Sequence, residues 1–92
     1  MQTNSDKINT TEILVSLQDI SDIFNLSYQT LNYYTSLGLL IPEKRKGNKR
    51  LYLIEEVKGR LDKMARLKNE GYPLRVIANI LNQNRSLDNG LL

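Results

Sequence analysis

Apolar residues recur at helical spacing near the start of the chain, after a polar leader. They fall three and four positions apart, which is the spacing of one face of an α-helix. The set is Leu17, Ile20, Ile23 and Phe24. Ser16 stands before this run as an N-cap, and Asp19 lies in the first turn, where the helix dipole favours a carboxylate. The pattern predicts a helix over 17–24.

A second helix is predicted over 28–37, with Ser27 as its N-cap and Gly38 just past its end. On the helical wheel Leu31 and Tyr34 share one face, which we expect to point inward. The opposite face is polar and aromatic but carries no charge, and hydrogen-bonding side chains of this kind suit base edges and phosphates. It consists of Gln29, Asn32, Tyr33 and Ser36.

About three residues join these two helices, and each helix opens with a serine. This arrangement is typical of a helix-turn-helix, whose second helix lies in the major groove of DNA. A helical hairpin in any small bundle has the same spacing. The spacing alone therefore leaves both interpretations open.

Two β-prone runs, 39–42 and 51–53, flank a Gly47-Asn48 turn and predict a β-hairpin. Five bases crowd the segment between the runs, so the tip of the hairpin is strongly basic. They are Lys44, Arg45, Lys46, Lys49 and Arg50. The hairpin resembles the wing of a winged helix, directed toward the phosphate backbone. The alternative is an edge hairpin whose lysines prevent aggregation.

Two further helices are predicted after the hairpin. The third runs from about 55 to 70 and stops at Gly71; its expected inward residues are Val57, Leu61, Met64, Ala65 and Leu67. Its expected charged outer face comprises Glu55, Glu56, Lys58, Arg60, Asp62, Lys63 and Arg66. The fourth begins near Pro73, keeps an apolar stripe and loses it from Asn82. That stripe is Leu74, Ile77, Ala78 and Leu81.

The predicted fold class is mainly α, a four-helix winged helix-turn-helix with a small β-hairpin wing between the second and third helices. Ninety-two residues fit a single core. We expect residues 1–12 to be a disordered leader, 13–82 the DNA-binding domain, and 83–92 a disordered or frayed tail.

Charge is distributed unevenly along the chain. Residues 1–41 carry a balance of −3, whereas residues 42–85 carry +7. A basic segment of this kind attracts polyanions, of which nucleic acid is the usual one, although a solvated basic loop is the plainer interpretation.

The chain contains no cysteine and no histidine. Disulfide frameworks, zinc fingers, thiolate nucleophiles and Ser-His-Asp triads are therefore excluded. No apolar run approaches the roughly 20 residues that cross a bilayer, and the N-terminus lacks the pattern of a signal peptide. We expect a soluble cytoplasmic protein associated with the nucleoid, with no membrane partner.

Three segments together resemble the DNA-binding domain of the MerR family of bacterial regulators. They are SYQTLNYYTSLGLL over 27–40, then Gly47, Arg50-Leu51-Tyr52 and Glu56-Val57, and finally EGYPL over 70–74 with Ile77. The resemblance covers roughly residues 14–82. It implies that the first two helices form the helix-turn-helix, the hairpin is the wing, and the second helix pair completes the domain.

The resemblance also implies a set of DNA-contacting residues. The start of the recognition helix would touch phosphates and base edges, Tyr33 would lie near the DNA backbone, and Arg50 would contact a phosphate or the minor groove. Tyr52 would combine packing with a phosphate contact, and a pure core role is the equal alternative. The expected set is Ser27, Tyr28, Gln29, Thr30, Asn32, Tyr33, Lys44, Arg45, Lys46, Lys49, Arg50 and Tyr52.

Departures from the family pattern matter as well. Asn32 stands where the family most often has arginine, and Thr35 replaces a frequent glutamate. The first change removes a phosphate clamp and the second an ion pair within the domain, so we expect weaker DNA binding per domain. Family regulators also continue into a dimerisation helix and an effector domain, whereas this sequence ends about ten residues after the fourth helix. Without cysteine or histidine, metal-sensing and redox-sensing versions are excluded.

The sequence thus predicts sequence-specific binding of double-stranded DNA by a MerR-type transcriptional regulator that lacks an effector domain, needs no cofactor and is not an enzyme. Expected partners are duplex DNA, a second copy on a two-fold site, and RNA polymerase. The alternatives are a small architectural factor, of the excisionase or packaging kind, and a protein-interaction module that binds an acidic partner.

Overall fold

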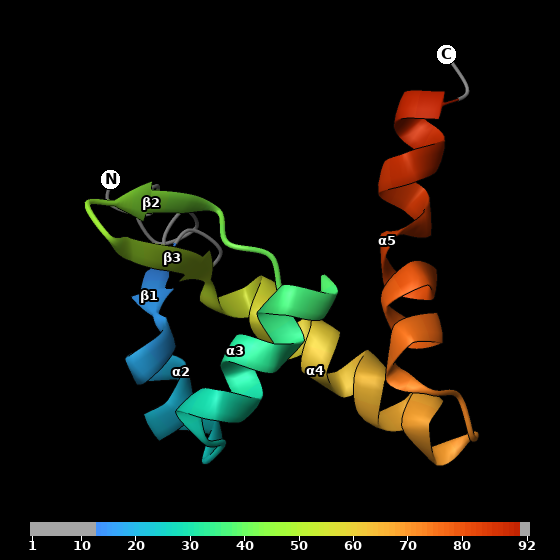
Figure 1. Ribbon diagram of the computed structural model, residues 1–92, viewed down its shortest axis with the longest axis horizontal. Helices are drawn as coiled ribbons and strands as arrows, with labels where there is room; N and C mark the ends of the chain where they lie inside the picture. Colours follow the sequence, from blue (N-terminus) through green and yellow to red (C-terminus); the bar gives the residue numbers. More distant parts are fainter. Residues whose placement is uncertain (1–12, 91–92) are drawn as a thin grey trace, which may run out of the picture.

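Four helices and a small three-stranded antiparallel sheet make up the computed structural model, which describes residues 13–90 and their side chains as far as Gln83 (Figure 1). In the order of the chain, two of the sheet's strands lie between the second and third helices, and the other strand precedes the first helix. The elements are β1 Leu14–Ser16, α2 Leu17–Phe24, α3 Tyr28–Leu37, β2 Lys44–Lys46, β3 Lys49–Leu53, α4 Ile54–Asn69 and α5 Leu74–Gly90. The predicted mainly α winged helix-turn-helix is confirmed.

Helices α2 and α3 have the predicted bounds because their caps form as the sequence indicates. The Ser16 hydroxyl accepts the Asp19 backbone N–H at 3.2 Å, and the Asp19 carboxylate accepts the Ser16 N–H at 3.0 Å. The two residues satisfy each other's backbone donors as a capping box. Ser27 accepts the Thr30 N–H at 3.0 Å, and Gly38 ends α3 with φ +84°, a conformation that favours glycine.

The sheet has the order β1-β3-β2, so that β3 is central. Strand β1 was not predicted, because its three residues merge directly into α2 and are too few to show a period of two. The predicted Gly47-Asn48 turn is confirmed. Only Gly47 has a positive φ there, +64°, as a type II′ turn requires at its first central position.

The first strand of the hairpin lies elsewhere than predicted. The apolar run over 39–42 is not a strand; the basic segment Lys44–Lys46 pairs with β3 instead. Leu39 and Leu40 are both fully buried, so this run crosses the core as a connection. Pro42 cannot donate a backbone hydrogen bond to a ladder, which agrees with pairing that begins after it.

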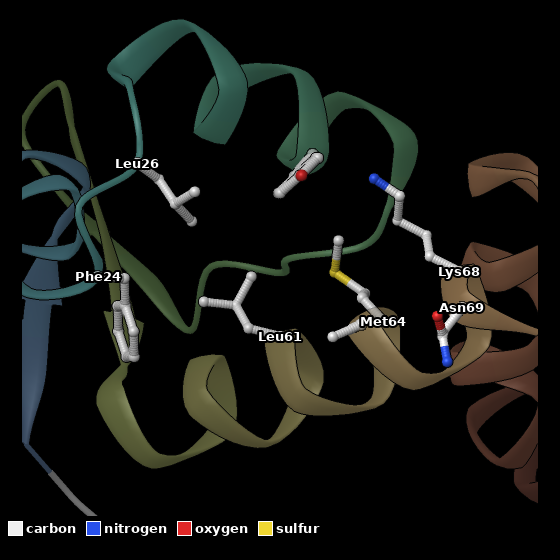
Figure 2. A pocket seen from close by; sticks show the side chains of 8 residues that line it. Phe24, Leu26, Leu61, Met64, Lys68 and Asn69 are labelled. Carbon is white, nitrogen blue, oxygen red and sulfur yellow. The ribbon is translucent and has the colours of Figure 1, made fainter.

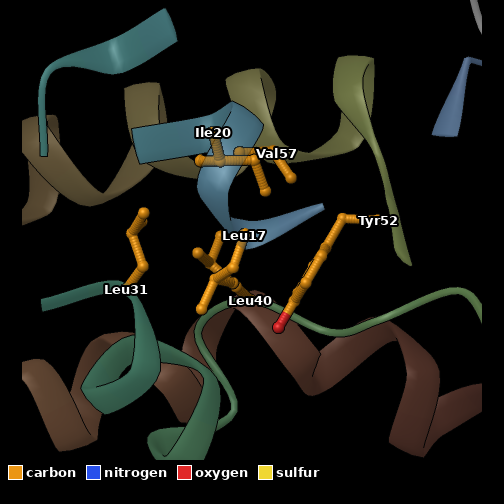
Figure 3. Close-up of a cluster of buried hydrophobic side chains, with 6 residues drawn as sticks. All are labelled: Leu17, Ile20, Leu31, Leu40, Tyr52 and Val57. Atoms are coloured by element: carbon orange, nitrogen blue, oxygen red, sulfur yellow. The ribbon is translucent and has the colours of Figure 1, made fainter. Parts of the chain in front are cut away.

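The core consists of two clusters on either side of this connection. The first holds six buried residues: Leu17, Ile20, Leu31, Leu40, Tyr52 and Val57 (Figure 3). The second comprises Leu39, Met64, Ile77 and Ala78. Leu40 belongs to the first cluster and Leu39 to the second, and Tyr34 packs against both clusters. The inward face of α3 is thereby fixed, and its opposite face is left to solvent.

Three side chains lie where the helical patterns did not place them. Arg60, expected on the outer face of α4, is buried and points toward the connection, where it donates to the Leu39 carbonyl at 3.0 Å. Ala65, expected inward, is exposed, as is Ile23 of α2, which keeps 57% of its surface. The wheel of a single helix does not say which neighbouring element covers each side, and that decides these three positions.

Helix α5 extends beyond its predicted end. Leu74, Ile77, Ala78 and Leu81 form its packed stripe as expected, but the helix continues past Asn82 to Gly90. The backbone over 83–90, within the expected frayed tail, is therefore helical. The expected leader over 1–12 and the last two residues lie outside the described part of the chain. No helix among the described residues is long and apolar enough to cross a membrane.

Candidate nucleic-acid interface

The outward face of α3 is the first component of the interface. Leu31 has no exposed surface, and this burial turns the opposite side of the helix to solvent. Tyr28 and Tyr33 keep about half of their surface exposed although they are large aromatic residues. The exposed set on this face is Tyr28, Gln29, Asn32, Tyr33 and Ser36, which confirms the predicted orientation of the helix.

Hydroxyl groups occupy the N-terminal end of α3. The Ser27 hydroxyl donates to Thr30 Oγ1 at 2.8 Å while it accepts the Thr30 N–H. Both side chains are therefore engaged with each other in the cap. Tyr28 and Gln29, which are exposed beside them, are freer to meet a ligand.

The wing is the second component, and its charges face each other across the hairpin. All of β2 is exposed, and the strand register places Arg45 opposite Arg50 and Lys46 opposite Lys49. Like charges directly opposite in a ladder repel each other and destabilise the pairing. A polyanion bound along the wing would relieve this repulsion. A hairpin whose charges served solubility alone would not need to place like charges opposite each other.

A direct hydrogen bond joins the two components. Arg50 Nη2 donates to Asn32 Oδ1 at 2.6 Å, from β3 to the outward face of α3. Asn32 was expected to leave the site without a phosphate clamp. In the structure it orients the arginine of the wing, so a guanidinium still lies beside this position of the recognition helix.

Tyr52 does not belong to the interface. It has no exposed surface, and its hydroxyl lies 3.0 Å from Thr35 Oγ1 inside the domain. The core interpretation of this residue is therefore correct and the expected phosphate contact is wrong. The other members of the expected set include every base of the wing, and all of these except the half-buried Arg50 are exposed.

A polar notch between the wing tip and the starts of α2 and α3 brings in residues that the sequence did not single out. Its volume is about 370 Å³, and Gln18 and Asn48 line it together with Tyr28, Lys49 and Arg50. Asn48 could have been suggested by its place in the turn beside the basic cluster. Gln18 carries no such signal, because only the packing of α2 against the sheet brings it near the wing.

Asp19 gives the rim of this region a fixed negative charge. The Ser16 backbone N–H, then the Ser16 hydroxyl and more weakly the charge of Lys49 lower the pKa of its carboxyl below the ordinary value. Lys49, the first residue of β3, therefore lies near an ionised carboxylate. The bases of β2 form no ion pair with a carboxylate among the described residues. They are therefore freer than Lys49 to bind an anion.

The remaining large hollow differs in chemistry. It measures about 590 Å³ and lies between α3 and α4, lined mainly by apolar side chains such as Leu26, Tyr34, Leu61 and Met64 (Figure 2). None of the expected DNA-contacting residues lines it. Among the described residues no group of three or more acidic, histidine or cysteine side chains gathers as a metal site.

Comparisons with known proteins agree with this geometry. Residues 15–84 match the model of a family described as MerR HTH family regulatory protein. No curated protein sequence and no solved structure matches the chain. The family match spans well over half of the 92 residues and includes α2, α3, the wing and α4. The chain therefore belongs to the MerR family of helix-turn-helix regulatory proteins, which bind DNA and regulate transcription.

Proposed function

We propose that this chain binds double-stranded DNA in a sequence-specific manner, with α3 in the major groove and the wing along the phosphate backbone. The observation that carries the proposal is the hydrogen bond from Arg50 to Asn32, because it connects the basic strand and the exposed face of α3 into one continuous surface. A hairpin with an unrelated role would not need to be joined to this face.

The two parts of the surface have different tasks. Helix α3 carries no charged side chain, so the electrostatic attraction to phosphates must come from the wing. Gln29 is exposed and has no hydrogen-bond partner among the described side chains, whereas Asn32 already accepts from Arg50. A free glutamine amide can form a bidentate pair with adenine N6 and N7. We therefore assign base reading chiefly to Gln29, with Tyr28 and Tyr33 beside it.

Family membership supports an action on transcription in the cytoplasm of a bacterium. Bound at a promoter, the domain would alter the access of RNA polymerase to the duplex. We propose that DNA binding through α3 and the wing is the regulatory activity of this domain.

The proposal is tested by selecting, from a random pool, the duplexes that the protein binds. The enriched duplex and a scrambled duplex are then each titrated with the protein and followed by fluorescence. We expect Gln29→Ala to reduce the preference for the enriched duplex by about tenfold, since one bidentate pair contributes about 1–3 kcal/mol of discrimination. Lys46→Ala should weaken both duplexes equally, and Lys58→Ala serves as a charge-matched control on α4. Absence of any enriched sequence, or an unchanged preference in Gln29→Ala, contradicts the proposal.

A further inference from the structure

The apolar hollow between α3 and α4 is not used by the DNA interface. Its volume of about 590 Å³ lies within the range of roughly 300–1,000 Å³ that is typical of small-molecule sites in proteins. Side chains from α2, α3, α4 and the turn between the first two helices line it with apolar surface. They are Phe24, Leu26, Tyr34, Leu61, Met64 and Ala65. A concave apolar surface of this size, formed by several elements, suits a small ligand with an apolar body.

A charged side chain and an amide stand at one end of this hollow. Figure 2 shows Phe24 and Leu26 at one end and Lys68 and Asn69 at the other, with Met64 between them. The lining contains no acid, and Lys68 forms no ion pair with a carboxylate among the described residues. The hollow therefore offers hydrocarbon to the body of a ligand, and one ammonium and one amide to an anionic head group.

The length of the hollow along α4 sets the length of the ligand. Leu61 and Lys68 stand two turns apart on the same face of this helix, which is about 10 Å at ~1.5 Å per residue. An extended chain of single bonds advances about 3.5 Å for every three bonds, so about nine bonds cover this distance. One ammonium suits a singly charged head group, whereas recognition of a phosphate favours arginine or several bases. A straight-chain carboxylic acid of about ten carbons has this length and charge.

The hollow contacts the recognition helix at two places. Leu26 lies in the turn that leads into α3, and Tyr34 lies on the inward face of α3. Tyr34 packs against both core clusters, and its carbonyl accepts the backbone N–H of Leu39 at 2.9 Å. A ligand that touches both side chains would stabilise α3 in the position in which Asn32 meets Arg50 of the wing. Occupancy of the hollow therefore favours the arrangement to which DNA binding is assigned above.

We propose that the hollow binds one molecule of a medium-chain carboxylic acid and that its occupancy strengthens the binding of DNA. The carboxylate lies at Lys68 and Asn69, and the alkyl chain runs along α4 toward Phe24 and Leu26. Met64 lies between the two ends, and its flexible thioether adapts to such a chain. The effect on DNA rests on the proposed function, whereas the binding of the acid does not. Because coupling between two sites is reciprocal, duplex DNA raises the affinity for the acid by the same factor.

Isothermal titration calorimetry of the protein without DNA tests the site, with decanoate below its micellar concentration as the probe. We expect one molecule to bind per chain. Octanoate should bind about tenfold more weakly, since it buries two methylene groups fewer. Dodecanoate should gain less than about twofold over decanoate, because its additional carbons extend past the hollow. An affinity that keeps rising with every added methylene group would overturn the site in favour of nonspecific adsorption.

Two variants at exposed positions of α4 test the two parts of the site. Lys68→Gln removes the charge and should weaken decanoate about fivefold, while the affinity for 1-decanol stays unchanged. Ala65→Phe places a ring in the hollow and should abolish the binding of both compounds. Lys58→Gln removes a charge from α4 outside the hollow and should change neither affinity. Equal losses of decanoate and 1-decanol in Lys68→Gln would overturn the position of the carboxylate, and full binding by Ala65→Phe would overturn the site.

Titration of the enriched duplex with and without saturating decanoate measures the effect on DNA. We expect decanoate to lower the Kd of the duplex about fivefold, and Ala65→Phe to bind the duplex normally without responding to the acid. Unchanged or weaker binding of the duplex by the occupied protein would overturn this effect. If Ala65→Phe dissociates a dimer of the free chain in sedimentation, the hollow is covered by a second copy and the proposal is overturned. If the protein binds no duplex at all, the proposed function fails, and calorimetry still decides whether the hollow binds the acid.

Discussion

The hydroxyl oxygens of Thr35 and Tyr52 lie 3.0 Å apart and join the recognition helix to the central strand of the wing. Thr35 donates its own proton to the Leu31 carbonyl at 2.9 Å, so Tyr52 is the donor in this pair. Thr35 stands where the resemblance expects glutamate. A partly buried pair of hydroxyls thus connects α3 with β3 without the cost of burying an ion pair.

Removal of this bond should weaken the domain modestly. Tyr52→Phe keeps the ring in the core and should lower the free energy of unfolding by about 1 kcal/mol, the usual net contribution of one hydrogen bond. Urea denaturation measures the change. Thr35→Val combined with Tyr52→Phe should cost less than the sum of the two single changes. Strict additivity would show that the two hydroxyls do not interact in solution.

The wing should supply affinity without sequence preference. Alanine at all four of Lys44, Arg45, Lys46 and Lys49 removes up to four phosphate contacts, and each should reduce the slope of log K against log salt by about 0.9. The free energy of unfolding should not fall, because two repulsive cross-strand pairs disappear with these charges. Titrations at several salt concentrations measure the slope, and an unchanged slope would show that the hairpin does not contact DNA.

Leu31 and Gln29 should separate stability from binding although they are two residues apart. Leu31→Ala should cost about 2–5 kcal/mol, since the side chain is fully buried and a cavity would remain. Gln29→Ala should change stability by less than about 0.5 kcal/mol, because the side chain is exposed. Thermal melts of both variants check this. A large loss in Gln29→Ala would mean that α3 is rotated relative to the structure.

The capping box of α2 should make stability depend on pH in the acidic range. Because hydrogen bonds from Ser16 lower the pKa of Asp19 in the folded state, the carboxylate stabilises the fold fully above its ordinary pKa of 3.8. This contribution is lost as the pH falls through the lower folded-state pKa. The melting temperature of Asp19→Asn should therefore lie below that of the native chain at pH 7, and the difference should shrink in strong acid. A difference that persists unchanged below pH 2 would assign it to something other than ionisation.

Local signals in the sequence were sufficient for the bounds of α2 and α3 and for the outward face of α3. Caps such as Ser16 and Ser27 act within a few residues of themselves, so they can be recognised without knowledge of the tertiary fold. The helical wheel likewise uses only residues within α3, and it predicted the exposed side of this helix. The set of wing bases was also recognisable, because five of them lie within seven residues.

Features that depend on distant partners could not be predicted in this way. Strand β1 exists because β3 offers it a ladder. Leu40 lies in the core because α2, α3 and β3 pack around it, and Leu39 because α4 and α5 do. Tyr52 is buried because residues of other elements, such as Leu17 and Leu31, form a core cluster with it. In each case the deciding neighbour is far away in the sequence, and a periodic pattern within one element carries no information about it.

Arg60 is the sharpest example, and it leads to the last prediction. Its guanidinium donates to the Leu39 carbonyl and to Asn82 Oδ1 at 2.9 Å, and Asn82 in turn donates to the Gly38 carbonyl. Arg60→Ala would leave the buried Leu39 carbonyl and the half-buried Asn82 Oδ1 without this donor, so we expect a loss of about 3 kcal/mol in the free energy of unfolding. Arg60→Lys should recover little of it, because an ammonium cannot reproduce the planar fork that reaches both acceptors.

Chemical denaturation of both variants measures this effect, with Arg66→Ala as the control. Arg66 is an exposed arginine on the same helix and should change stability by less than about 0.5 kcal/mol. Asn82→Ala should cost less than Arg60→Ala, since it removes only the α5 end of the same network. If Arg60→Ala were as mild as the control, the guanidinium would not connect α4, α5 and the end of the recognition helix, and its apparent burial would contribute nothing to the position of α3.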